Sequence, residues 1–155
     1  MQLPAYLRML VGAERSVADA YRAVASANPD EADVRFTCTG FAADCDQHAD
    51  ALAPVAERYE TRDRPDPNAR GDRLDPLPFE LARSGPVGLL RDLADLLQLA
   101  TFVESTWTLI GQAAHGARDR ELIDLCASSG AAVAGQLAWI RMRLRASAAQ
   151  ALLVA

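Results

Sequence analysis

The sequence predicts an all-α protein, an antiparallel four-helix bundle made of two helical hairpins that are joined by one long crossover. Half of the 155 residues are hydrophobic and only 6% are aromatic, a composition typical of packed helices. Apolar residues recur at steps of three and four along four segments, which is the period of a helix with one buried face. Two of the three connections are very short, so each should join antiparallel neighbours.

The length suits a single domain, residues 1–155, with its own core. The formal net charge is −5, and the one basic cluster, Arg141, Arg143 and Arg145, falls in the last turns of a predicted helix, where cations suit the dipole. We therefore expect no nucleic-acid partner. Three cysteines without a disulfide pattern fit a cytoplasmic protein. Charged residues interrupt the most apolar segment, so we expect no membrane span.

The first two helices are expected over about residues 4–26 and 29–59. Asn28 can cap the second helix, and Pro29 suits its first turn, where a missing N–H costs nothing. Pro54 should kink or end that helix, because proline removes one backbone hydrogen bond. The two helices should therefore form a tight hairpin.

A proline-rich crossover is expected over residues 60–85, followed by helices over about 86–115 and 119–146. The third helix is apolar on two sides, and such a helix must be covered on two sides. The crossover or a second copy of the chain would supply this cover. A homodimer through the third helix would then depend on residues such as Leu96 and Val103.

Each predicted helix carries one polar residue on its apolar face: Glu14, His48, Glu104 and Gln136. Cys45 lies on the same face as His48, one turn earlier. An unpaired polar group in a core costs about 1–3 kcal/mol. We therefore expect these side chains to face one another in the middle of the bundle.

This connectivity and these residues resemble the ferritin-like superfamily, whose members bind two iron or manganese ions mid-bundle through carboxylates and Glu-x-x-His motifs. The resemblance implies that Glu14, His48 and Glu104 correspond to ligands of the first three helices. Cys45 stands where the motif has its bridging glutamate, and Gln136 resembles the fourth-helix glutamine of ferritins. A cysteine binds metal as a thiolate, which prefers softer metals than iron.

Three interpretations stay open. In the principal one, Tyr21 joins the four polar residues in a metal-free network, and the protein is a binding or scaffold protein with no catalytic residue and no cofactor. In the second, Glu14, His48 and Glu104, or Cys45 with His48, bind iron, manganese or zinc, with residual oxidoreductase activity. In the third, the bundle binds a small apolar ligand or assembles through its third helix.

Overall fold

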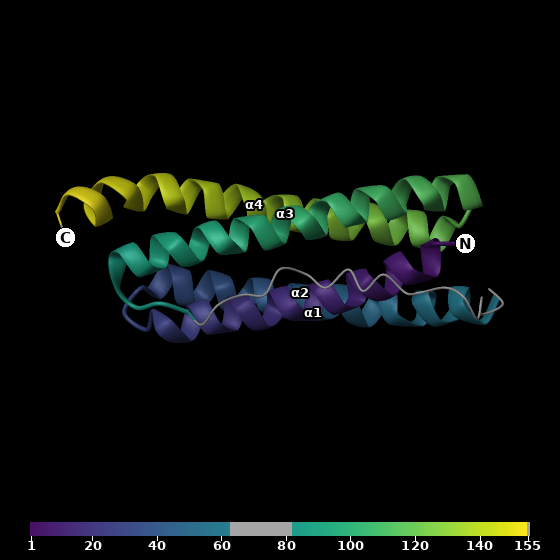
Figure 1. The fold of residues 1–155 in the computed structure, drawn as a ribbon, viewed down its shortest axis with the longest axis horizontal. Coiled ribbons are helices and arrows are strands. Elements are labelled where there is room, and N and C mark those ends of the chain that lie inside the picture. Colours follow the sequence, from purple (N-terminus) through teal and green to yellow (C-terminus); the bar gives the residue numbers. More distant parts are fainter. Residues whose placement is uncertain (63–81, 155) are drawn as a thin grey trace.

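The computed structural model describes residues 1–62 and 82–154, and within these ranges it contains four α-helices and no strand (Figure 1). The helices are α1 (Leu3–Ala27), α2 (Ala32–Arg62), α3 (Gly85–Ala117) and α4 (Arg120–Leu153). The predictions of an all-α class and of four helices are confirmed.

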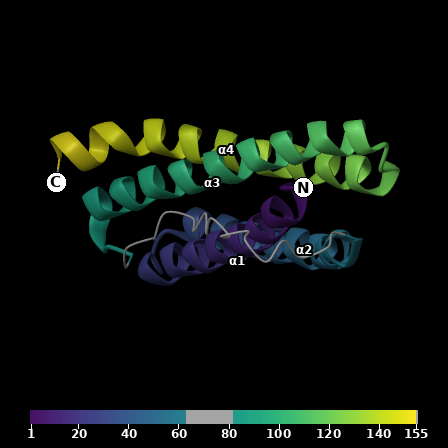
Figure 2. The same cartoon turned by 45° about the vertical axis from the view of Figure 1, so that its right-hand side comes forward.

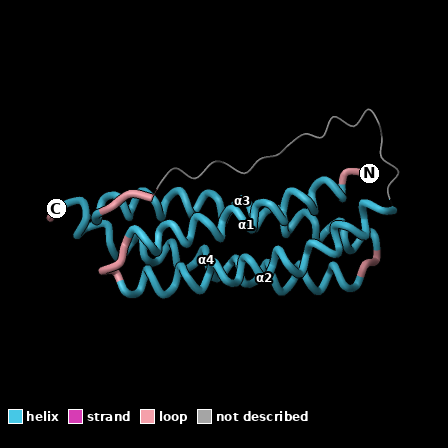
Figure 3. Tube along the Cα trace, turned by 90° about the horizontal axis from the view of Figure 1, so that it is seen from below, coloured by secondary structure: helices cyan, strands magenta, loops and turns pink. Residues whose placement is uncertain are grey.

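The four helices lie along one long axis, as two views of the ribbon and the tube show (Figures 1, 2 and 3). Helix α1 packs along α2, and α3 packs along α4. Helix α1 also contacts α3, whereas α2 and α4 meet over a smaller area. In the described ranges the diagonal pairs, α1 with α4 and α2 with α3, do not come into backbone contact. Side chains from all four helices therefore meet around one central axis.

The junction of α1 and α2 differs from the prediction. The side-chain amide of Asn28 donates to the carbonyl oxygen of Val24 at 2.9 Å, and its backbone N–H points back to Ala25. Asn28 therefore closes α1 instead of capping α2, and α2 begins at Ala32, after Pro29. An asparagine side chain can bond backbone groups at either kind of helix end.

Two helices end later than predicted. Helix α2 continues through Pro54 to Arg62, so that proline does not end it. Helix α4 continues to Leu153 instead of ending near residue 146. The predicted crossover therefore begins later than residue 60, and most of it lies outside the described residues.

Both apolar sides of α3 are used inside the chain. Leu96 is fully buried and Val103 is 1% exposed, and both belong to the common core. These are the residues through which we expected a second copy to dock, so they offer no free surface. The homodimer itself stays a prediction.

Ion pairs connect the outer edges of α1 and α2. Arg8 pairs with Glu60, Arg15 with Asp50, and Arg22 with Asp46. Such exposed pairs add little stability, but they show which turns of the two helices are neighbours. Near the start of α2, Arg143 of α4 binds Glu31 and Asp33.

Helix α4 is long and apolar enough to cross a membrane, although we expected no such helix. This property is one of length and composition alone, and core helices of soluble proteins share it. One third of the most apolar 18-residue stretch of α4 is buried within the fold. The absence of a membrane partner stays a prediction.

Candidate functional site

Glu14 is the centre of the site. It lies on the buried face of α1 between Leu10 and Val17 and is fully buried. Its Oε1 atom accepts a hydrogen bond from Nε1 of Trp107 on α3 at 2.7 Å. The same oxygen lies 3.1 Å from Nδ1 of His48 on α2. One carboxylate oxygen therefore connects three helices.

The contact between Glu14 and His48 favours one tautomer of the imidazole. A carboxylate oxygen only accepts, so Nδ1 must be protonated to donate to Glu14. The imidazole ring also stands edge-on to the ring of Trp107, with centroids 6.2 Å apart and planes at 85°. The side chain of His48 is 12% exposed, and that of Glu14 is fully buried. His48 therefore links the buried carboxylate to the protein surface.

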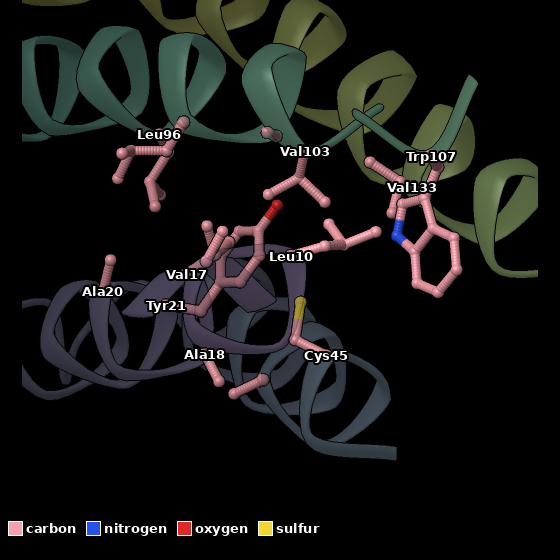
Figure 4. Close-up of a cluster of buried hydrophobic side chains, with 14 of the residues drawn as sticks. Leu10, Val17, Ala18, Ala20, Tyr21, Cys45, Leu96, Val103, Trp107 and Val133 are labelled. Atoms are coloured by element: carbon pink, nitrogen blue, oxygen red, sulfur yellow. The ribbon is translucent and has the colours of Figure 1, made fainter. Parts of the chain in front are cut away.

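A second group of polar side chains lies beside the first. The hydroxyl of Tyr21 on α1 donates to Oε1 of Gln136 on α4 at 3.2 Å. Nε2 of Gln136 lies 3.7 Å from Sγ of Cys45, and Oε1 lies 3.8 Å from the same sulfur. Figure 4 shows Tyr21 and Cys45 reaching toward the α3 and α4 side of the core. Gln136 therefore joins α4 to α1 and α2.

The two groups influence each other through Cys45. Burial raises the pKa of the Cys45 thiol well above its usual range, and the neighbouring Glu14 carboxylate raises it further. The amide of Gln136 opposes this shift. Burial also raises the pKa of Tyr21, and the neighbouring Cys45, Cys38 and Glu14 side chains act in the same direction. Cys45 and Tyr21 are therefore protonated donors near neutral pH.

The second carboxylate oxygen of Glu14, Oε2, is buried and has no hydrogen-bond partner among the described residues. A buried acceptor without a partner costs about 1–3 kcal/mol.

The structure brings together four of the five predicted site residues: Glu14, Cys45, His48 and Gln136. Glu104 does not join them. It is half-buried on α3, and its side chain forms no hydrogen bond or ion pair with another described residue. Glu104 therefore lies outside the network that we predicted it to complete.

Sequence reasoning missed Trp107, which lies on the buried face of α3. Trp107 is 1% exposed, and its N–H group makes the shorter of the two hydrogen bonds to Glu14. A buried indole N–H usually has a hydrogen-bond partner. This rule could have identified Trp107 as a hydrogen-bond donor from the sequence, because the chain has only two tryptophans to consider.

Asp92 was also missed. This fully buried carboxylate near the start of α3 accepts from the backbone N–H and the guanidinium of Arg83, both at 2.7 Å. The same guanidinium reaches Asp95 at 3.1 Å. This cluster anchors the chain as it enters α3, and it is separate from the network around Glu14.

The residues do not fit a metal site well. Among residues 1–62 and 82–154, no three His, Cys, Asp or Glu side chains converge as a metal ion would require. Cys45 could serve only as a thiolate, and burial favours its protonated form. The ligand set implied by the ferritin-like resemblance is therefore incomplete in this geometry.

Comparisons of the chain with protein-family models, with curated proteins and with solved structures find no match. The resemblance to ferritin-like proteins accordingly depends on the pattern of residues and helices alone.

Proposed function

We propose that this chain is a ferritin-like four-helix bundle that acts as a non-catalytic binding or scaffold protein. In this proposal a hydrogen-bonded network occupies the position of the superfamily's metal centre. The main observation in support of this proposal is that Oε1 of Glu14 accepts two hydrogen bonds, one from His48 and one from Trp107. Those bonds occupy the lone pairs with which this oxygen would bind a metal ion.

The order of the ion pairs supports the antiparallel arrangement. Along α1 the partners are Arg8, Arg15 and Arg22, while their partners on α2 fall from residue 60 to residue 46. Two helices that run in opposite directions give this order. The connections from α1 to α2 (residues 28–31) and from α3 to α4 (residues 118–119) are both short. A long segment separates α2 from α3, as in a bundle with one crossover.

The network explains how a bundle without metal would keep one arrangement. Glu14 depends on α2 and α3 for its donors, and Gln136 of α4 depends on α1 and α2. Sliding one helix by a turn would separate several of these groups at once and leave them buried without partners. The polar core therefore specifies the register of the helices, and binding would take place at the outer faces.

One observation favours a metal site as the second candidate. Oε2 of Glu14 is buried and unpartnered, and Cys45 and His48 lie beside the same carboxylate. Iron, manganese or zinc held by Glu14, His48 and a displaced Glu104 is the arrangement that this candidate requires. Oxidoreductase activity would in turn require a metal ion bound at this site.

Metal content separates the two proposals. Untagged protein purified without chelator should contain far less than one iron, manganese or zinc per chain by elemental analysis. Addition of each metal should leave the unfolding temperature unchanged. Near-stoichiometric metal that is lost in His48→Ala would overturn the network proposal. The matched control is His115→Ala, because His115 is exposed at the end of α3.

A further inference from the structure

The two helical hairpins of the bundle meet along two boundaries, one between α1 and α3 and one between α2 and α4. In Figures 1 and 2 the hairpins form separate layers, α1 with α2 and α3 with α4. The backbones of α2 and α4 come close at fewer places than those of α1 and α3. The buried bond from Trp107 to Glu14, at 2.7 Å, also joins α3 to α1. The α2–α4 side is therefore the weaker boundary between the hairpins.

One arginine closes each end of this boundary. Arg143 of α4 pairs with Asp33 near the start of α2, and Arg58 near the end of α2 pairs with Asp119, the cap of α4, both at 2.7 Å. From Asp33 to Arg58 the helix rises about 38 Å, so the two pairs lie far apart. Each arginine also pairs with a second carboxylate, at 2.8 and 2.6 Å: Glu31 for Arg143 and Glu121 for Arg58. We call the boundary between these pairs the α2–α4 seam, and Arg58 and Arg143 the seam arginines.

The contacts in the middle of the seam are weak. The ring of Phe41 on α2 stands edge-on to the ring of Trp139 on α4, with centroids 5.7 Å apart, and both residues are half-buried. Gln136 lies 3.7 Å from the sulfur of Cys45, and sulfur forms only weak hydrogen bonds. Within residues 1–62 and 82–154, no other pair of side chains forms a hydrogen bond across this part of the seam. The seam arginines therefore make the strongest polar contacts between α2 and α4.

We propose that the α2–α4 seam opens as a gate to the polar core, with the α1–α3 contact as its hinge and the two seam arginines holding it closed. Both hairpins stay folded in the open state. Opening separates Phe41 from Trp139 and Cys45 from Gln136, so these side chains become accessible to solvent.

The bonds of Glu14 survive this movement. Its contact with His48 lies within the α1–α2 hairpin, and its bond from Trp107 lies at the hinge. Gln136, by contrast, reaches α1 and α2 from the other hairpin. The gate therefore exposes the core without stranding the buried carboxylate, and it does not depend on whether Glu14 binds a metal ion.

Two buried cysteines distinguish an opened seam from an unfolded chain. Cys45 is fully buried at the seam. Cys126 is 7% exposed and lies within the α3–α4 hairpin, against Gly111. Opening of the seam exposes Cys45 and leaves Cys126 covered, whereas unfolding exposes both.

Alkylation by iodoacetamide, an uncharged reagent, tests the gate in two single-cysteine variants of the full chain. One variant retains Cys45 and the other retains Cys126, with the remaining cysteines replaced by alanine. The alkylation rate at Cys45 should rise only slightly with added urea, because opening exposes much less surface than unfolding. The rate at Cys126 should rise steeply, since its exposure requires unfolding. An equally steep dependence on urea at both cysteines overturns the proposal.

Charge reversal at a seam arginine tests what holds the gate closed. Arg143→Glu should raise the alkylation rate at Cys45 by about tenfold, because it places like charges beside Asp33 and Glu31. The rate at Cys126 should change by less than about twofold, because that residue is distant from the substitution. No increase at Cys45, or an equal increase at both cysteines, overturns the proposal.

The matched control is Arg8→Glu, which reverses an arginine that pairs with Glu60 inside the α1–α2 hairpin. This pair does not cross the seam, so the rate at Cys45 should stay within about twofold of its original value. An acceleration by Arg8→Glu as large as that by Arg143→Glu would show that the seam arginines have no special role, and it also overturns the proposal.

Discussion

Glu14 and His48, 34 residues apart and on different helices, are joined by a 3.1 Å contact between a fully buried carboxylate oxygen and Nδ1 of the imidazole. Trp107 donates to the same oxygen from a third helix. Removal of one partner should therefore weaken the packing of several helices, because the remaining groups stay buried without their bonds.

Removal of the Tyr21 hydroxyl tests the second group of the network. Tyr21→Phe should lower the free energy of unfolding by about 1 kcal/mol, because Gln136 loses a buried donor. Urea denaturation measures the effect. Tyr6→Phe is the control: Tyr6 is half-buried and its hydroxyl forms no hydrogen bond with the described residues, so its change should stay within about 0.5 kcal/mol. Equal effects would show that the Tyr21 hydroxyl does not support the core.

Alkaline pH should destabilise the protein through its buried thiols. Burial raises the pKa of Cys38 to about 12, and of Cys126 to about 11, from an ordinary value of 9.0. The folded state therefore keeps these protons at a pH at which the unfolded chain releases them. This contribution to stability is complete below about pH 9 and is lost as the pH rises toward 11–12.

Urea denaturation under reducing conditions at pH 8, 9 and 10 measures this loss. The free energy of unfolding should fall between pH 9 and 10 by an amount on the order of 1 kcal/mol per buried thiol. Cys38→Ala should flatten the dependence on pH, since one titrating group is removed. A pH profile that is flat for the wild type, or that is the same for this variant, would contradict the expectation.

Acidic pH should destabilise the protein through Asp119, the carboxylate that caps α4. It caps α4 through the N–H of Leu122 at 3.2 Å and accepts from Arg58 at 2.7 Å and from Tyr59 at 2.8 Å. Burial opposes its ionised form, but the bonds from Leu122 and Tyr59 and the charge of Arg58 outweigh this effect and lower its pKa. Its contribution is present above the pKa of an unfolded aspartate, near 4, and is lost as the pH falls through the lower folded value.

Asp119→Asn should therefore lower the free energy of unfolding at pH 7 by about 1–2 kcal/mol. The stability of this variant should also depend less on pH below 4. Asp44→Asn, at an exposed position on α2, should change stability by less than about 0.5 kcal/mol. A loss at Asp44 as large as the loss at Asp119 would mean that the cap and its partners add nothing specific.

The helices and much of the network could be predicted from the sequence because a helix repeats its buried face every three to four residues. A polar residue on that face, such as Glu14, His48 or Gln136, must find a partner across the core. Glu104 does not follow this rule because it lies, with Leu90 and Leu97 at seven-residue spacing, on the half-buried edge of α3. The row of Leu93, Ala100 and Trp107 is the buried one.

Other features depend on tertiary contacts that hydropathy does not record. The bond from Trp107 to Glu14 requires the packing of α3 against α1. The role of Asn28 could not be decided locally, because its side chain can close one helix or begin the next.

The free energy of unfolding of Glu14→Gln, compared with that of Glu104→Gln, tests the central claim most directly. We predict a loss of about 1–3 kcal/mol for Glu14→Gln, since its bonds to His48 and Trp107 depend on the carboxylate. We predict a change within about 0.5 kcal/mol for Glu104→Gln, which lies on the same bundle but outside the network. Equal losses, or no loss for Glu14→Gln, would contradict the account.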